Sequence, residues 1–316
     1  MINLAIIGVG RHSRLHHGPA IRKLRDRLRH VVVADLNIRA AEEYAADFGL
    51  DRCYGDVDEM LCAERPDGII AVTPEAVTAE MFCKLLPRRL PLLMEKPFGE
   101  TLAETGRLCR LASQERARVM LSLNRRYAPV CRKIRELLNG PLAGRPVRHV
   151  RGAMFRQSRF DSNFIRATAI HLIDMVNCFG GAPGQVVSVQ ASRREAGSAP
   201  AVSALLSFPS GATGELLVDS DSGFIAECYE LTGRDFRIEA DYFRGYTLYE
   251  GGKITGKFEL DARLPLEERE GADVELATFI DGVEQAAATF PTGPEDALAA
   301  ARIADAMAQV AGEKEK

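Results

Sequence analysis

The chain has 316 residues, 46% of them hydrophobic and 27% charged, a balance typical of soluble globular proteins with about two domains. This composition excludes a largely disordered chain, a collagen-like repeat and a coiled coil. With 41 basic and 44 acidic residues the formal charge is −3, which is too small to attract nucleic acid or an anionic membrane.

Strand and helix signals alternate through the first third of the chain. Apolar runs predict strands at residues 4–8, 31–35, 68–72, 91–94 and 119–123, and the run at 31–35 is rich in β-branched residues. Periodic segments predict helices at residues 19–29, 39–48, 77–86 and 102–115. Repeated units of this length form a parallel sheet with helices on both faces. We therefore predict a doubly wound dinucleotide-binding (Rossmann) domain over residues 1–121.

Strand signals dominate residues 122–291. Strands are expected at 147–155, 185–192, 202–208, 213–219, 226–232 and 237–240, and helices at 129–138 and 168–179. The turn sequence of residues 208–211 predicts a hairpin. This part reads as an α+β substrate domain built on a mainly antiparallel sheet. An alanine-rich helix follows within residues 292–312, with Glu295 and Asp296 in its first turn.

The cysteine pattern and the first residues suggest a cytoplasmic location. Seven cysteines occur without a CxxC pair, as expected for reduced thiols. Residues 2–9 follow Met1 without the basic segment or cleavage site of a signal peptide. No run of the roughly 20 predominantly apolar residues that cross a bilayer occurs in the sequence. We expect no membrane or nucleic-acid partner.

A glycine turn lies between the first predicted strand and helix. In Gly8-Val9-Gly10 the first glycine permits a tight turn, and the second lets the backbone approach a pyrophosphate at the helix N-terminus. Arg11 and His12 would lie beside this pyrophosphate. The third glycine position holds Ser13, whose hydroxyl could donate to a phosphate. A strand–turn–helix without a nucleotide is the alternative.

An acidic residue ends the second predicted strand. Asp35 lies 25 residues after Gly10, near the interval at which a carboxylate accepts hydrogen bonds from the adenosine ribose. A carboxylate also repels a 2′-phosphate, so we predict NAD rather than NADP as the cofactor. Arg39, one helical turn later, could pair with a phosphate and weakens that preference.

Residues 93–98 read Leu-Met-Glu-Lys-Pro-Phe, and with the glycine turn this sequence resembles the Gfo/Idh/MocA family of sugar and polyol dehydrogenases. Supporting matches are Ala-Val-Thr-Pro at 71–74, Asn-Arg-Arg-Tyr-Ala-Pro at 124–129, Ile-His-Leu-Ile-Asp at 170–174 and Gly-Pro-Glu-Asp-Ala-Leu at 293–298. The resemblance implies an open-faced sheet in the second domain and an active site between the domains. It also implies that helix 292–312 packs back on the first domain. A homodimer or homotetramer would form through the open sheet face.

The resemblance also assigns residues to roles. Thr73, Pro74, Glu95, Lys96 and Asn124 would contact the dinucleotide, and the Lys96–Pro97 bond is commonly cis in the family.

Lys96 and His171 would be the catalytic residues. Lys96 would hydrogen-bond the substrate hydroxyl and relay its proton, while His171 would orient the same hydroxyl or exchange its proton. Asp174 would fix the imidazole or bind another hydroxyl. The plainer alternatives are a solvated lysine and a half-buried structural histidine.

The chain departs from the family pattern at two positions. Ala167 replaces an aspartate that usually lies four residues before the histidine, so its role would pass to Arg166, Thr168 or Asp174. Thr78 stands where a histidine is common. We therefore expect an NAD(P)-dependent dehydrogenase acting on a ring hydroxyl of a sugar, sugar derivative or cyclic polyol. A nucleotide-binding sensor without turnover, or a redox-assisted lyase or glycosidase that retains NAD, is the alternative.

Several other charged residues and histidines are candidates for substrate or metal binding. Arg125, Arg126, Arg156 and Arg159 either recognise an acidic group of the substrate or belong to the sheet surface. His12 and His16 have the i,i+4 spacing of metal ligands, and His17 adjoins them. No acidic or thiol partner stands near them in sequence, so we expect no metal site.

Overall fold

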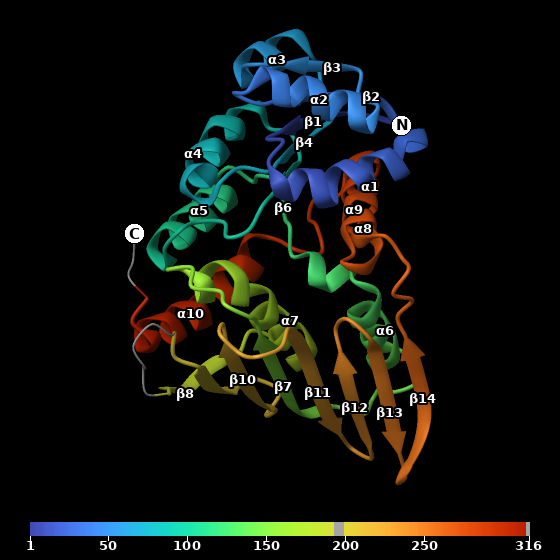
Figure 1. Ribbon diagram of the computed structural model, residues 1–316, viewed down its shortest axis with the longest axis vertical. Helices are drawn as coiled ribbons and strands as arrows, with labels where there is room; N and C mark the ends of the chain where they lie inside the picture. Colours follow the sequence, from blue (N-terminus) through green and yellow to red (C-terminus); the bar gives the residue numbers. More distant parts are fainter. Residues whose placement is uncertain (193–198, 314–316) are drawn as a thin grey trace. The chain divides into compact units, whose positions relative to one another are not determined.

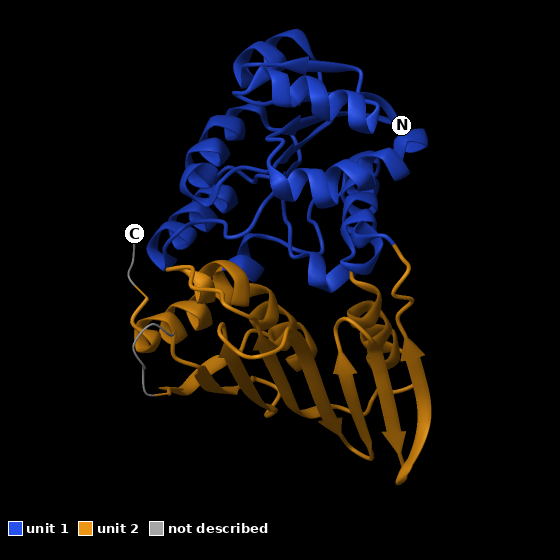
Figure 2. Cartoon of the chain, viewed as in Figure 1, with its two compact units in different colours: residues 1–127, 265–297 blue, residues 128–264, 298–316 orange. Residues whose placement is uncertain are grey.

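The computed structural model describes residues 1–192 and 199–313. The chain forms two compact units, coloured separately in Figure 2. Unit 1 comprises Met1–Tyr127 and Pro265–Ala297, and unit 2 comprises Ala128–Leu264 and Leu298–Lys316. Among the described residues, no helix combines the length and apolar character needed to span a membrane.

Unit 1 contains a six-stranded parallel sheet in the order β3-β2-β1-β4-β5-β6. Its strands are β1 (Ile2–Ile7), β2 (Leu28–Ala34), β3 (Arg52–Tyr54), β4 (Gly68–Ala71), β5 (Leu92–Met94) and β6 (Val119–Leu121). This order is that of dinucleotide-binding domains, and it confirms the predicted doubly wound sheet. Strand β3 was not predicted, because its three residues are too few and too polar to give a pattern.

Unit 1 also contains helices, most of which connect these strands. They are α1 (Gly18–Lys23), α2 (Ile38–Phe48), α3 (Val57–Ala63), α4 (Glu75–Leu85), α5 (Leu102–Gln114), α8 (Leu266–Arg269) and α9 (Ala272–Glu284), with short 3-10 turns η2 (Arg25–Arg27), η3 (Leu86–Arg88) and η4 (Asn124–Tyr127). A π-helical turn, η1 (Ser13–His17), precedes α1. The predicted helix at residues 19–29 is therefore too long, since β2 already begins at Leu28.

The core of unit 1 includes a helix from late in the chain. Leu276, Phe279 and Ile280 of α9 pack with the buried strand residues Ile6 and Val33. Helix α9 lies within residues 122–291, the range that the sequence predicts for the second domain. Its apolar face instead covers the parallel sheet.

The last helix, α10 (Pro294–Ala311), differs from the expectation that it packs back on the first domain. It begins in unit 1, but the chain from Leu298 onward belongs to unit 2. Ile303 and Met307 of this helix are buried in the core of unit 2. The alanines on the apolar face of α10 allow this packing, because their small side chains let the helix approach the core of unit 2 closely.

Unit 2 contains an eight-stranded sheet in the order β14-β13-β12-β11-β7-β10-β9-β8. Its strands are β7 (Val147–Phe155), β8 (Gln185–Ala191), β9 (Val202–Ser207), β10 (Thr213–Asp219), β11 (Ala226–Gly233), β12 (Phe236–Asp241), β13 (Gly245–Glu250) and β14 (Lys253–Glu259). Only β7 and β10 pair in parallel, so the sheet is mixed and mostly antiparallel, as predicted. The hairpin β9–β10 is confirmed, whereas β13 and β14 were not predicted.

One face of this sheet is covered by α6 (Pro129–Asn139), α7 (Ile170–Gly180) and α10, as Figure 1 shows. Close packing of α7 depends on Gly152 in β7, where a Cβ atom would lie 2.6 Å from Cγ2 of Val176. The opposite face carries the alternate residues of each strand, such as Arg151 and Glu230, which are exposed or half-buried.

Candidate active site

The turn after β1 has the geometry that a bound dinucleotide requires. Gly8 has φ +93°, and a Cβ atom there would lie 2.1 Å from the carbonyl oxygen of Val72, so only glycine fits. A Cβ atom at Gly10, in contrast, would have no heavy atom within 4 Å. The backbone is therefore open at the point where the helical turn begins with Arg11 and His12. These residues fit a pyrophosphate at a helix N-terminus.

Ser13, at the third glycine position, has a different environment from the one expected. It is fully buried, and its hydroxyl donates to the phenol oxygen of Tyr44 on α2 at 2.9 Å. The hydroxyl is thus satisfied inside unit 1, and a phosphate contact for it is not supported. The small side chain instead allows close packing, which is the role of the third glycine in such motifs.

Asp35 lies beside the glycine turn at the end of β2. Its Oδ2 accepts a hydrogen bond from the Val9 N–H at 3.0 Å, and its Oδ1 accepts one from the Asn37 N–H at 2.9 Å. The carboxylate is half-buried and retains acceptor capacity on both oxygens. It can therefore receive ribose hydroxyls. Arg39 is exposed on α2.

Thr73 and Pro74 form the turn between β4 and α4. The Thr73 and Thr78 hydroxyls lie 3.1 Å apart, and the Thr78 hydroxyl donates to the Pro74 carbonyl at 3.2 Å. Thr78 stands where a histidine is common in the family, and its hydrogen bonds stabilise this turn.

Glu95 ends β5 and faces two histidines from the glycine-turn helix. Its Oε1 lies 2.8 Å from Nε2 of His17 and 3.3 Å from Nε2 of His12. Glu95 and His17 are buried, whereas the His12 side chain is 42% exposed. His16 completes the cluster, with its ring centroid 4.4 Å from that of His12. The sequence carried no signal for the pairing of His17 with Glu95, because 78 residues separate them.

The charges in this cluster shift the pKa values of its members. Burial alone would raise the pKa of Glu95, but the charges and hydrogen bonds of His12 and His17 hold it well below its usual value. Burial would lower the pKa of His12, and the adjacent Glu95 carboxylate outweighs that effect and raises it. For His16, burial and the charges of His12 and His17 lower the pKa to about 3. Glu95 is therefore ionised at neutral pH and His16 is neutral.

Lys96 follows Glu95 directly. It is half-buried, and its bond to Pro97 is cis, as the resemblance implied. Its positive charge acts on His12. Asn124 follows shortly after the end of β6. Its side chain is buried, and its Oδ1 accepts a hydrogen bond from Nη1 of Arg125 at 3.2 Å.

A second buried carboxyl group in unit 1 was missed by sequence reasoning. Oε2 of Glu275, on α9, accepts a hydrogen bond from the Ser122 hydroxyl at 3.0 Å. Burial raises the pKa of Glu275 well above its usual value, and the negative charge of Glu95 adds to this effect. Glu275 therefore keeps its proton to a higher pH than Glu95 does.

The remaining catalytic candidates belong to unit 2. His171 and Asp174 are both buried on α7, where the i,i+3 spacing brings them to one side of the helix. A π-helical turn, η5 (Ile165–Ala169), precedes α7 and contains Ala167 and Thr168. Thr168 is half-buried, and its Oγ1 lies 3.5 Å from Nη2 of Arg159. Lys96 lies in unit 1, so its action with His171 remains a prediction.

The arginines weighed as substrate ligands have acidic partners in the protein. Arg166 is buried, with Nη2 at 2.8 Å from Asp305 and Nη1 at 3.6 Å from Glu313. The other close pairs are Arg156 with Glu227 at 2.6 Å, Arg159 with Asp161 at 2.6 Å, Arg126 with Asp296 at 2.8 Å and Arg125 with Glu270 at 3.7 Å. Arg166 and Arg156 are thus the candidates most firmly held by the protein itself.

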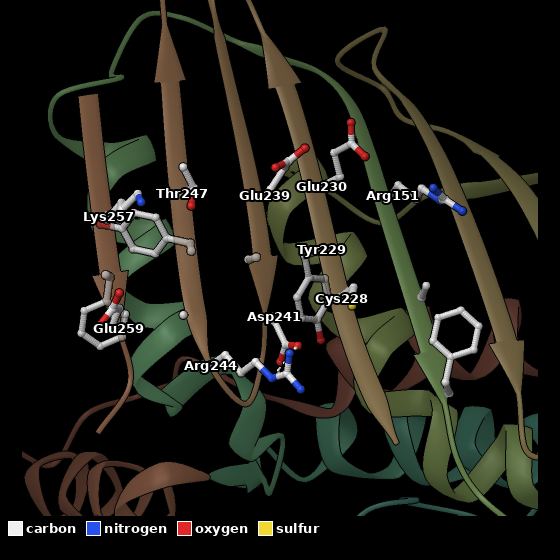
Figure 3. Close-up of a pocket in the computed structure, with 16 residues that line it drawn as sticks. Arg151, Cys228, Tyr229, Glu230, Glu239, Asp241, Arg244, Thr247, Lys257 and Glu259 are labelled. Atoms are coloured by element: carbon white, nitrogen blue, oxygen red, sulfur yellow. Dashed lines mark ion pairs between the residues drawn. The ribbon is translucent and has the colours of Figure 1, made fainter. Parts of the chain in front are cut away.

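The open face of the unit 2 sheet carries a shallow hollow of about 620 Å³. Figure 3 shows Arg151, Glu230 and Glu239 standing on this face, with helices behind the strands. Phe155, on the same side of β7 as Arg151, adds aromatic surface to the lining. No residue proposed for catalysis lines this hollow, so it is a separate surface.

Comparison with known proteins agrees with the geometry of unit 1. Residues 2–123 match the model of an oxidoreductase family with an NAD-binding Rossmann fold, Gfo/Idh/MocA. The chain is 25% identical over 349 aligned residues to inositol 2-dehydrogenase of Rhizobium meliloti, covering 99% of this chain and 98% of that protein. A 26% match to the rhizopine catabolism protein MocA of the same species covers 45% of this chain and 43% of that protein.

Solved structures share the fold of the whole chain. A dehydrogenase from Chromobacterium violaceum superimposes with a TM-score of 0.86 at 21% identity, over 98% of this chain and 95% of that one. Levoglucosan dehydrogenase, in complex with NADH and levoglucosan, gives a TM-score of 0.82 at 17% identity, over 98% and 97%. The glycine turn, the parallel sheet order and the match of residues 2–123 show that unit 1 carries an NAD-binding Rossmann domain of the Gfo/Idh/MocA oxidoreductase type.

Proposed function

We propose that the protein transfers a hydride between NAD and a ring hydroxyl carbon of a sugar, sugar derivative or cyclic polyol. The observation that carries this proposal is the glycine turn with Asp35 hydrogen-bonded to it. The substrate class is supported by the names of relatives, which include inositol 2-dehydrogenases and a levoglucosan dehydrogenase. A small-molecule partner of this kind is rich in hydroxyl groups, which suits the polar candidates around His171.

The choice of NAD over NADP rests on Asp35. Two backbone N–H groups hold its carboxylate at the end of β2. A fixed negative charge at this point favours ribose hydroxyls and repels a 2′-phosphate. Arg39 lies four residues after Asp35 and is exposed. Its side chain is therefore less preorganised to bind a 2′-phosphate than Asp35 is to bind the ribose.

In this proposal, some of the candidate residues transfer a proton and the others bind the substrate. The bound dinucleotide supplies the hydride acceptor or donor. Lys96 hydrogen-bonds the substrate hydroxyl and relays its proton, and His171 orients the hydroxyl or shares that proton. Asp174 holds the imidazole or a second hydroxyl, while Thr168 and Arg125 contribute further polar contacts to the substrate. Arg166, already paired with Asp305, has the least free donor capacity of these candidates.

Ala167 supports two other functions. It is buried and offers no carboxylate where relatives commonly have an aspartate. A chain that binds NAD but lacks part of the proton relay could serve as a nucleotide-dependent sensor. A redox-assisted lyase or glycosidase that retains its NAD is the other alternative.

The test offers purified protein NAD together with a panel of cyclic polyols and sugars and follows absorbance of the reduced nicotinamide. Net reduction that disappears in Lys96→Ala supports the proposed dehydrogenase. Tight NAD binding without turnover on the whole panel favours the sensor. Product formation without net reduction favours the lyase or glycosidase.

We also propose that the open sheet face of unit 2 joins copies of the chain into a homodimer or homotetramer. Leu205 on β9 is 51% exposed on this face, and Phe155 on β7 lines the hollow farther along the same sheet. Exposed apolar surface of this kind marks interaction sites. Sedimentation velocity should show a Leu205→Glu variant with a smaller assembly than wild type, whereas Leu15→Glu, an exposed leucine of unit 1, should leave assembly unchanged.

A further inference from the structure

We propose that His12, His17 and Glu95 form a binding site for a divalent transition-metal ion of the zinc type. The ligand atoms are Nε2 of His12, Nε2 of His17 and Oε1 of Glu95, which all lie within 4.8 Å of one another. All three residues belong to unit 1. The proposal does not depend on the hydride-transfer function.

The distances suit a tetrahedral site. Zinc binds imidazole nitrogen and carboxylate oxygen at 2.0–2.2 Å, which sets neighbouring ligand atoms about 3.3 Å apart. The Glu95 oxygen is 3.3 Å from Nε2 of His12 and 2.8 Å from Nε2 of His17. The separation at His17 is thus about half an ångström shorter than this spacing, and the ligand atoms of the two histidines lie within 4.8 Å of each other.

The local backbone explains how two histidines five residues apart reach the same carboxylate. On a regular α-helix, positions i and i+5 point about 140° apart. Here η1 is a π-helical turn, in which the Gly18 N–H donates to the Ser13 carbonyl. This wider turn returns the fifth residue to nearly the same side, so His12 and His17 both face Glu95. Such turns inside helices occur frequently at functional sites.

The chemistry of the three side chains fits zinc. Two imidazoles and one carboxylate form a ligand set that leaves a fourth position open to water. Glu95 and His17 are buried, and the partly exposed His12 provides access from solvent. The negative charges of Glu95 and Glu270 and the positive charge of Lys96 all act on His12.

This inference replaces the expectation of no metal site. That expectation rested on the lack of an acidic residue near His12 in sequence. The parallel sheet provides one, because the carboxyl end of β5 brings Glu95 to the helix that follows β1.

The experiment measures zinc binding to the tag-free chain without dinucleotide, by equilibrium dialysis and metal analysis. We expect one zinc ion per chain at saturation. His12→Ala should weaken this binding by more than about 100-fold, since it removes a direct ligand and even outer-shell changes weaken metal affinity 10–100-fold. His12 is the preferred position for substitution because its partial exposure makes loss of folding a small risk. Thermal unfolding without metal checks that the variant is folded.

His30→Gln is the matched control. His30 lies in unit 1 with Asp51 at 3.5 Å and Glu64 at 3.2 Å, so it also has carboxylate neighbours, but it is not part of the proposed site. Its loss should leave zinc affinity unchanged. A stoichiometry near zero overturns the proposal, as does a loss of less than tenfold in His12→Ala.

Cobalt provides a second measurement that needs no variant. Co²⁺ bound to wild-type protein should show the intense visible absorption of a four-coordinate ion, and zinc should displace it. Weak absorption like that of hydrated cobalt overturns the proposal.

Discussion

The backbone N–H of Val9 donates to Oδ2 of Asp35 at 3.0 Å, which ties the end of β2 to the glycine turn after β1. A second bond, from the Asn37 N–H to Oδ1 at 2.9 Å, fixes the other oxygen. The carboxylate is therefore oriented before any ligand arrives. A group held in this way loses little conformational entropy when it receives ribose hydroxyls.

Replacing Asp35 with alanine should weaken NAD binding far more than NADP binding. The change removes a charged acceptor of the ribose hydroxyls, which is worth about 1.5–3 kcal/mol, or roughly a 10- to 100-fold change in the dissociation constant. It also removes the repulsion of a 2′-phosphate. Titrations of wild type and variant with both dinucleotides measure the effect as a ratio of affinities.

The ratio of the NAD and NADP affinities distinguishes a loss of ribose recognition from damage to the glycine turn. Loss of the bonds to Val9 and Asn37 would weaken both dinucleotides equally. Asp35→Asn keeps an acceptor and removes the charge, so it should gain affinity for NADP without a large loss of stability. Equal losses for both cofactors in Asp35→Ala would contradict the assignment to the ribose.

Replacing Lys96 with alanine should lower turnover by about 10²–10⁴-fold, the usual contribution of a positioned proton-transfer group. NAD affinity should change by much less, because the glycine turn and Asp35 remain. The measurement is the steady-state turnover rate of wild type and variant on any substrate found in the polyol panel. Lys84→Ala is the matched control, since this lysine pairs with Asp58 on the surface of unit 1. A Lys96→Ala variant with the wild-type rate would remove the lysine from the mechanism.

The parallel sheet was predictable because its strands are buried on both faces. Residues 31–33 are three consecutive valines, and continuous apolar runs of this kind distinguish buried parallel strands from amphipathic helices. Strand β3 and the pair β13–β14 escaped prediction, because they are short or polar and depend on neighbours for pairing. Helix α9 was missed for another reason, since residues 272–284 have an apolar face that no local signal links to the first sheet.

The candidate site was predictable only where motifs are local. Gly8, Gly10 and Asp35 follow from spacing along one strand–turn–helix unit. The contact of His17 with Glu95 joins residues 78 apart, and it depends on a π-helical turn that no residue pattern announced. The burial of Ser13 against Tyr44 was likewise invisible, because it depends on the approach of α2.

The buried carboxyl group of Glu275 should make the stability of the protein depend on pH. Burial, together with the charge of Glu95, raises its pKa in the folded state, and the Ser122 hydrogen bond offsets only part of this. The folded state therefore binds this proton more tightly than the unfolded chain does. The contribution of Glu275 is fully favourable below the unfolded pKa of about 4.3, and it is lost as the pH rises through the folded-state value.

Glu275→Gln should remove that dependence. The amide keeps an acceptor for Ser122 but carries no charge at any pH. The stability of the variant relative to wild type should therefore increase with pH, by up to about 1.4 kcal/mol per pH unit between the two pKa values. Urea unfolding at several pH values between 5 and 8 gives this difference. A constant difference across the series would show that Glu275 titrates in the folded protein as it does in the unfolded chain.

Arg166 was assigned to the substrate, and its surroundings allow that role to be separated from a structural one. The guanidinium donates to Oδ1 of Asp305 at 2.8 Å from Nη2, and both side chains are buried in unit 2. Arg166→Met leaves the aspartate without its partner, which should destabilise the protein by about 3–5 kcal/mol. Arg166→Met combined with Asp305→Leu replaces the closest pair of charges by apolar groups and should recover much of that loss, while Glu313, 3.6 Å from Nη1 of Arg166, keeps its hydrogen bond from the Ile165 N–H. Urea unfolding of the single and double variants measures these changes, and KM of the stable double variant then decides the role. An unchanged KM assigns Arg166 to the ion pair alone, whereas a KM raised tenfold or more in a protein of normal stability assigns it to the substrate.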